Sequence, residues 1–114
     1  MKSPADIITE LDALRAQIAR SANETREAEL RAADESDAFT REYATAYKRA
    51  SGSVEDRKQT ATLETIRFKT SKDRALIELA FVKQCGRDLE SQQSNLQTQA
   101  RLLDTYLRSL GRNS

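Results

Sequence analysis

The sequence has no histidine and no tryptophan, and it holds a single cysteine, Cys85. Without histidine, the chain lacks the commonest general base, the commonest metal ligand and every Ser-His or Cys-His nucleophile pair. One cysteine cannot form an intramolecular disulfide or a Cys-x-x-Cys site. Three glycines cannot supply a glycine-rich phosphate-binding loop. We therefore expect a protein that is not an enzyme, with no cofactor, no metal site and no small-molecule ligand.

Long apolar runs are missing as well. No window approaches the roughly 18 consecutive apolar residues that a transmembrane helix needs. The N-terminus lacks the basic segment and apolar run of a signal peptide. We therefore expect a cytoplasmic protein that does not enter a membrane. Its one proline and three glycines leave few places for the chain to turn, and so polar a composition suits helices that each bury one stripe.

The first helix is predicted over about residues 4–50. Ser3 is a good N-cap, Pro4 fits the first helical position, and Asp6 follows the cap by three residues. Apolar or small residues then recur at a spacing of three or four, which is the helical period. These seam positions are Ile7, Leu11, Leu14, Ile18, Ala22, Thr25, Ala28, Ala32, Ser36, Phe39, Tyr43, Ala46 and Ala50.

A turn is predicted at residues 51–53, and a second helix over about 54–110. Gly52 suits the left-handed position after a helix end, while Ser53 with Asp56 makes a capping pair. Two heptad positions form a coiled-coil seam. They are Ala61, Phe68, Ala75, Val82, Leu89, Leu96, Leu103 and Leu110, and Thr65, Lys72, Leu79, Gly86, Gln93, Ala100 and Leu107. At Gly86, either the helix bends or another backbone passes closely.

The fold class that these signals predict is all-α, a long antiparallel, coiled-coil-like helical hairpin that forms a single domain over 1–114. Folding back at Gly52 makes the numbers of facing residues sum to about 104. Small residues then face large ones, as Ala22 faces Val82 and Ser36 faces Phe68.

Some apolar side chains have no place in a lone hairpin. At that register the start of the first helix lies opposite residue 100, so the first helix leaves the leucines after that point uncovered. The run around Ile77 is also apolar on nearly every face of its helix. We expect a homo-oligomer, a four-helix bundle or a higher assembly; the alternative is a monomer whose C-terminal tail folds back as a third helix. The expected oligomer interface consists of Leu76, Ile77, Phe81, Leu96, Leu103, Tyr106, Leu107 and Leu110.

Charge is unevenly distributed although the net charge is only +1. Residues 1–40 carry 5 basic and 9 acidic side chains, whereas residues 41–74 carry 9 basic and 5 acidic ones. The basic side chains near the turn are a candidate nucleic-acid site, and a solvated face with intrahelical ion pairs is the simpler interpretation. The candidate set is Lys48, Arg49, Arg57, Lys58, Arg67, Lys69, Lys72 and Arg74.

The segment EYATAYKRASGSVEDRK, residues 42–58, carries a resemblance. An acidic and aromatic helix end is followed by a Gly-Ser-Val turn, an arginine and a second helix that ends in leucines. Over about residues 40–110 the chain resembles small helical proteins of tailed bacteriophages, many encoded near replication and recombination genes. The resemblance implies an accessory role in phage DNA metabolism or in countering the host, and it implies no catalytic residue.

Three functional hypotheses follow. The first is a non-enzymatic, oligomeric helical interaction or adaptor protein that binds another macromolecule, with itself and another protein as partners. The second is a single-stranded DNA-binding accessory of phage replication or recombination, acting through the basic turn end. The third is a phage inhibitor of a host defence protein.

Overall fold

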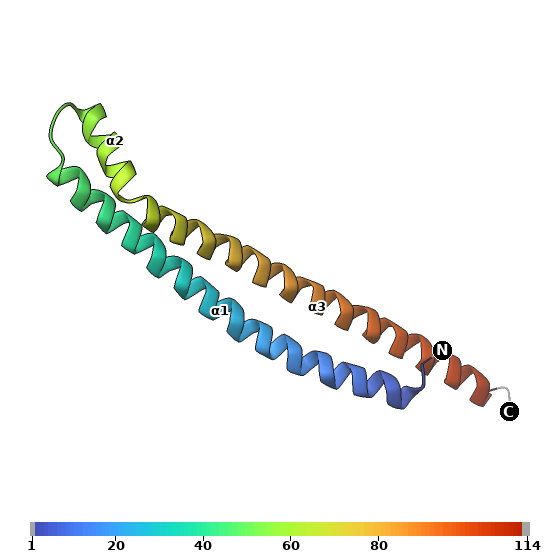
Figure 1. The fold of residues 1–114 in the computed structure, drawn as a ribbon. Coiled ribbons are helices and arrows are strands. Elements are labelled where there is room, and N and C mark those ends of the chain that lie inside the picture. Colours follow the sequence, from blue (N-terminus) through green and yellow to red (C-terminus); the bar gives the residue numbers. More distant parts are fainter. Residues whose placement is uncertain (1, 113–114) are drawn as a thin grey trace. The chain divides into compact units, whose positions relative to one another are not determined.

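The structure, a computed structural model, describes residues 2–112. It is an all-α antiparallel helical hairpin, as predicted, but it is built from three helices: α1 (Pro4–Arg49), α2 (Val54–Glu64) and α3 (Ile66–Arg112) (Figure 1). The chain divides into two compact units. One unit joins α1 up to Glu24 to α3 from Lys83, and the other unit is Thr25–Val82. In each unit, α1 lies against the chain that returns from the turn.

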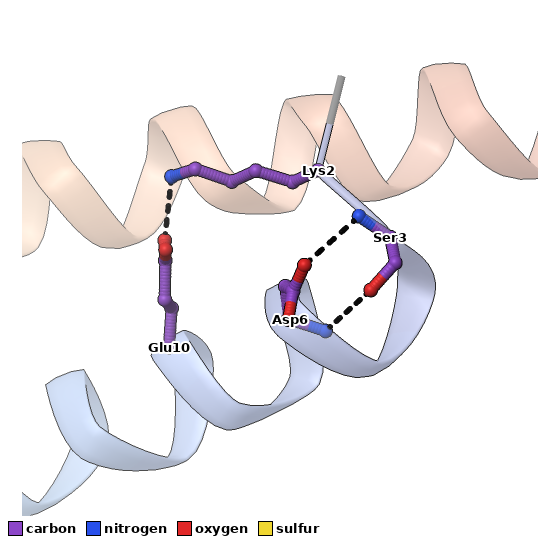
Figure 2. A network of polar contacts seen from close by, with 4 residues as sticks. All are labelled: Lys2, Ser3, Asp6 and Glu10. Atoms are coloured by element: carbon purple, nitrogen blue, oxygen red, sulfur yellow. Dashed lines mark hydrogen bonds and ion pairs between the residues drawn. The ribbon is translucent and has the colours of Figure 1, made fainter.

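The start of α1 is held by a capping pair. The Asp6 backbone N–H donates to Ser3 Oγ at 3.1 Å, and the Ser3 N–H donates to Asp6 Oδ2 at 3.3 Å (Figure 2). These two bonds satisfy backbone donors that the first helical turn leaves without an intrahelical partner. Beside them, Lys2 Nζ lies 2.6 Å from Glu10 Oε2. The predicted cap at Ser3 is confirmed.

The turn between α1 and α2 follows the predicted chemistry. Gly52 has φ 104°, in the left-handed region that favours glycine. Ser53 Oγ accepts from the Asp56 N–H at 3.1 Å, and Asp56 Oδ2 accepts from the Ser53 N–H at 3.2 Å. The link between α1 and α2 therefore contains both the glycine that ends α1 and the capping pair that starts α2.

The returning arm is not the single helix that the heptads predicted, because it is interrupted at Thr65. This residue has φ −108° and ψ 14°. Its hydroxyl donates to the Ala61 carbonyl at 2.6 Å, and its own N–H donates to the same oxygen at 3.1 Å. A buried β-branched side chain thus competes with the backbone for one acceptor. Figure 1 shows the ribbon changing direction between α2 and α3 at this point.

The seam of the returning arm is confirmed from Ala61 to Leu103. Every residue of the two predicted heptad positions in this range is buried or half-buried. Leu107 and Leu110, the last predicted members, are exposed. In the unit Thr25–Val82, the buried seam residues are small: Ala28, Ala32, Ala46, Ala61, Thr65 and Ala75. In the other unit they are Ile7, Leu14, Ser21 and Leu96. Small buried residues allow α1 and the returning arm to approach closely.

The seam of α1 was predicted correctly except at one step. Ala22 is exposed, and the neighbouring Ser21 is buried instead. A Cβ placed on Gly86 would lie 3.0 Å from Ser21 Oγ, so α1 passes close to α3 at this glycine. The helix α3 continues through Gly86 without interruption. Of the two explanations for this glycine, the structure supports the close approach.

The predicted register of 104 is wrong by about one to two helical turns where α3 lies alongside α1. The paired residue numbers sum to 107 for Ser21 and Gly86, to 109 for Arg31 and Glu78, and to 111 for Phe39 and Lys72. Only beside the turn, where Arg57 contacts Tyr47, is the sum 104. The register changes after the interruption at Thr65, where the returning arm changes direction between α2 and α3.

Candidate interaction surfaces

The described residues contain no cluster of three or more side chains suited to holding a metal ion. Cys85 is a free, half-buried thiol. None of the described helices is sufficiently long and apolar to cross a membrane. The features that remain as candidate sites are therefore surfaces: the basic side chains near the turn and the exposed apolar side chains of α3.

Two of the eight basic candidates are used within the hairpin. Arg57 donates through Nε and Nη2 to the Tyr47 carbonyl, at 3.3 and 3.2 Å, and its guanidinium lies 4.5 Å from the centre of the Tyr47 ring. This contact satisfies a carbonyl of the last turn of α1. The Lys72 ammonium lies 5.0 Å from the centre of the Phe39 ring. Both contacts are cation–π interactions that hold the returning arm against α1.

The other six basic candidates are exposed but do not share one face. They are Lys48, Arg49, Lys58, Arg67, Lys69 and Arg74. Seven residues, about two turns, separate Arg67 from Arg74, so these two lie on one side of α3. Lys69 lies about 200° around the helix from Arg67. Asp73 follows Lys69 by four residues, a spacing at which helical charges of opposite sign interact.

In the unit Thr25–Val82, Arg31 and Glu78 form an ion pair that joins α1 to α3. The Arg31 Nη1 lies 2.5 Å from Glu78 Oε1, and each side chain is about half exposed. The hydrogen bond to Glu78 and the charge of that carboxylate raise the pKa of the Arg31 guanidinium above its already high ordinary value. Arg31 is therefore a cation at every pH at which the protein is handled.

Exposed apolar side chains lie on the face of α3 that points away from α1, with the polar Thr70 and Asp73 between Ile66 and Ile77. Ile77 is 70% exposed and Phe81 is 68% exposed. Ile66 precedes Ile77 by about three turns and is on the same face, and Leu63 of α2 is also exposed. Phe68 of the seam is two and a half turns from Ile77, on the opposite side of the helix. We call Leu63, Ile66, Ile77 and Phe81 the outer stripe.

Only part of this stripe was predicted from the sequence. The predicted set included Ile77 and Phe81 together with Leu76, which is less exposed. Leu63 and Ile66 were not predicted, because they lie outside the seam. The spacing of eleven residues between Ile66 and Ile77 is the signal that could have found the second stripe.

A second apolar surface lies in the other unit, at the end of α3. Leu102, Tyr106, Leu107 and Leu110 are exposed there, and Ile8 of α1 is exposed beside them. We call these five residues the end surface. Leu103, also predicted as an interface residue, is half-buried. Leu96 is only 6% exposed. Its assignment to an oligomer interface is corrected, because the seam of the hairpin already buries it.

Two apolar grooves flank the buried Ile7 at this end. A groove of about 210 Å³ is lined by Pro4, Ile7, Ile8, Leu11, Ala100, Leu103, Asp104 and Leu107. A groove of about 300 Å³ is lined by Lys2, Ile7, Gln99, Leu102, Leu103 and Tyr106. Residues of α1 and α3 contribute to both, so the end surface is hollowed on either side of the seam.

Comparisons of the chain with models of protein families, with curated proteins and with solved structures gave no match.

Proposed function

We propose that this protein is a non-enzymatic helical interaction protein that acts by binding another macromolecule through the outer stripe of α3. The observation that carries the proposal is the exposure of Ile77 and Phe81 on the face of α3 opposite the seam. A helix that is apolar on two opposite faces is normally covered on both. The hairpin covers only one of them.

The side chains beside the outer stripe indicate what kind of partner fits it. Arg67 and Arg74 lie along one edge of the stripe, and Lys69 lies along the other together with Asp73. An amphipathic helix of another protein could place apolar side chains on Ile66, Ile77 and Phe81. Acidic side chains on one flank of that helix would then meet Arg67 and Arg74. We therefore propose an acidic amphipathic helix as the partner segment.

The test is capture of a partner by three tagged forms of the chain: native, Ile77→Asp and Ser71→Asp. Ser71 is an exposed polar residue of α3 in the same unit, so its variant adds the same charge outside the stripe. The proposal requires a protein that is retained by the native chain and by Ser71→Asp and is lost with Ile77→Asp. Equal retention by all three forms would refute it.

Binding of single-stranded DNA is the second candidate function, favoured by the six exposed cations near the turn. The proposal is weaker for two reasons: Arg57 and Lys72 are engaged within the hairpin, and the remaining cations are spread over more than one face. The resemblance to tailed-phage proteins supports a phage origin and a place in the host cytoplasm. The process served would be phage DNA metabolism or occlusion of a host defence protein.

A further inference from the structure

The seam of α3 continues beyond the part that α1 covers. The heptad residues are buried or half-buried as far as Leu103, but Leu107 and Leu110 are exposed. The helix α1 begins at Pro4, which lines the same groove as Leu107. It therefore does not cover the turns of α3 that follow Leu107. The last turns of α3 thus expose the same heptad pattern of apolar residues that α1 covers earlier in the helix. The segment that covers them should pack as another helix of the same period.

The charges at this end are complementary to one another. Residues 2–12 carry Lys2 and three carboxylates, Asp6, Glu10 and Asp12, for a net charge of −2. Residues 101–112 carry three arginines and Asp104, for a net charge of +2. The acidic start of α1 and the basic end of α3 lie in the same unit. A second copy can therefore place the basic end of its α3 beside the acidic start of α1 in the first copy, and the reverse.

We infer that the end surface is where a second copy of this chain docks, with the last turns of the two α3 helices antiparallel about a two-fold axis near Leu107. In this arrangement Leu110 of each copy lies opposite Leu103 of the other. The exposed leucines then extend each seam and border the grooves beside Ile7. Such an interface is isologous, and it closes at two chains.

The charge pattern selects the antiparallel direction. Arg108 and Asp104 form an ion pair within α3, at 3.2 Å. An antiparallel pair centred on Leu107 places Asp104 of one copy within about two residues of Arg108 of the other, roughly 3 Å along the helix axis. A parallel pair would instead place the two basic ends of α3 side by side and away from the acidic first turns of α1, which is unfavourable. In the antiparallel pair, the basic end of the second α3 passes along the acidic first turns of α1.

This inference concerns a different surface from the outer stripe, so the two can fail separately. The experiment measures mass by sedimentation equilibrium in the variant Ile77→Asp, which removes association through the outer stripe. We expect twice the mass of the chain. Adding Leu107→Asp and Leu110→Asp should reduce the mass to that of one chain, with the helical circular dichroism retained because both leucines are exposed. A single-chain mass for Ile77→Asp, or a double mass for the triple variant, would overturn the inference.

Disulfide trapping tests the axis independently of stability. With Cys85→Ser as the background, Leu107→Cys places two thiols close to the axis, whereas Arg101→Cys places them about twelve residues apart. Cysteines whose Cα atoms are more than about 7 Å apart cannot be bridged. We expect mild oxidation to produce covalent dimers at least tenfold faster for Leu107→Cys. Equal rates for the two variants would contradict the antiparallel geometry.

Discussion

Ser21 and Gly86 face each other where α1 passes close to α3, since a Cβ on Gly86 would lie 3.0 Å from Ser21 Oγ. A glycine inside a helix costs up to about 1 kcal/mol relative to alanine. Here the cost is offset by the close packing that the absent side chain allows. Ser21 is buried at this contact because its small side chain fits between α1 and α3.

Replacing Gly86 with leucine should therefore destabilise the hairpin by about 1–3 kcal/mol, the usual range for a side chain forced into a packed site. Gly111→Leu is the matched control, because a Cβ there meets no atom within 4 Å. Urea unfolding followed by circular dichroism measures both variants. If Gly86→Leu is as stable as the native chain, the close approach of α1 is wrong.

Substituting Leu96 tests whether this residue is buried in the seam of the hairpin. Leu96→Ala removes a buried side chain and should lower the free energy of unfolding by about 2–4 kcal/mol. Leu102→Ala makes the same chemical change at an exposed position, and we expect an effect within about 0.5 kcal/mol for the monomer. Thermal melts of dilute protein give the comparison. Similar losses for the two leucines would contradict the burial of Leu96.

The ion pair of Arg31 with Glu78 should respond to salt but not to ordinary changes of pH. The pKa of Arg31 is raised in the folded state, so its contribution is complete below its unfolded pKa and is lost only as pH rises through the folded value. Both lie far above neutrality. A double-mutant cycle with Arg31→Met and Glu78→Gln should show a coupling that weakens in high salt. A coupling that disappears between neutral pH and about pH 10 would contradict this assignment.

We expect the binding of single-stranded DNA to be weak. One strand along the edge of α3 that holds Arg67 and Arg74 reaches two or three of the exposed cations. Each phosphate contact contributes about −0.7 to the salt slope for single strands, so we expect a slope of roughly −1 to −2. Fluorescence anisotropy at several salt concentrations measures it. The variant Arg67→Glu with Arg74→Glu should abolish the signal, and a slope near −4 would instead require all six cations to act together.

Much of the fold follows from short-range signals in the sequence. The caps at Ser3 and Ser53 and the turn at Gly52 were predictable because each depends on neighbours within three residues. The heptads of the returning arm predicted its buried face from Ala61 to Leu103. The same signals could not give the register, because an alanine-lined middle of α1 can pack at several offsets. They also could not show that Thr65 interrupts the arm.

The surfaces were predictable only in part. The apolar run around Ile77 indicated a second buried face, yet Leu63 and Ile66 were missed because they lie outside the seam. Leu96 was assigned to the oligomer interface although the predicted seam already included it, and the structure buries it there. The roles of Arg57 and Lys72 depend on Tyr47 and Phe39 across the hairpin, and contacts of this kind become visible only when the register is known.

The most direct test of the central claim is the affinity of the captured partner for two variants of equal charge. Isothermal titration would compare Ile77→Asp with Ser71→Asp. Truncating or charging a central interface side chain usually costs at least about 2 kcal/mol, which corresponds to roughly a 30-fold loss of affinity. We predict such a loss for Ile77→Asp, an unchanged affinity for Ser71→Asp and the same melting temperature for both. Equal affinities would show that the outer stripe is not the binding surface.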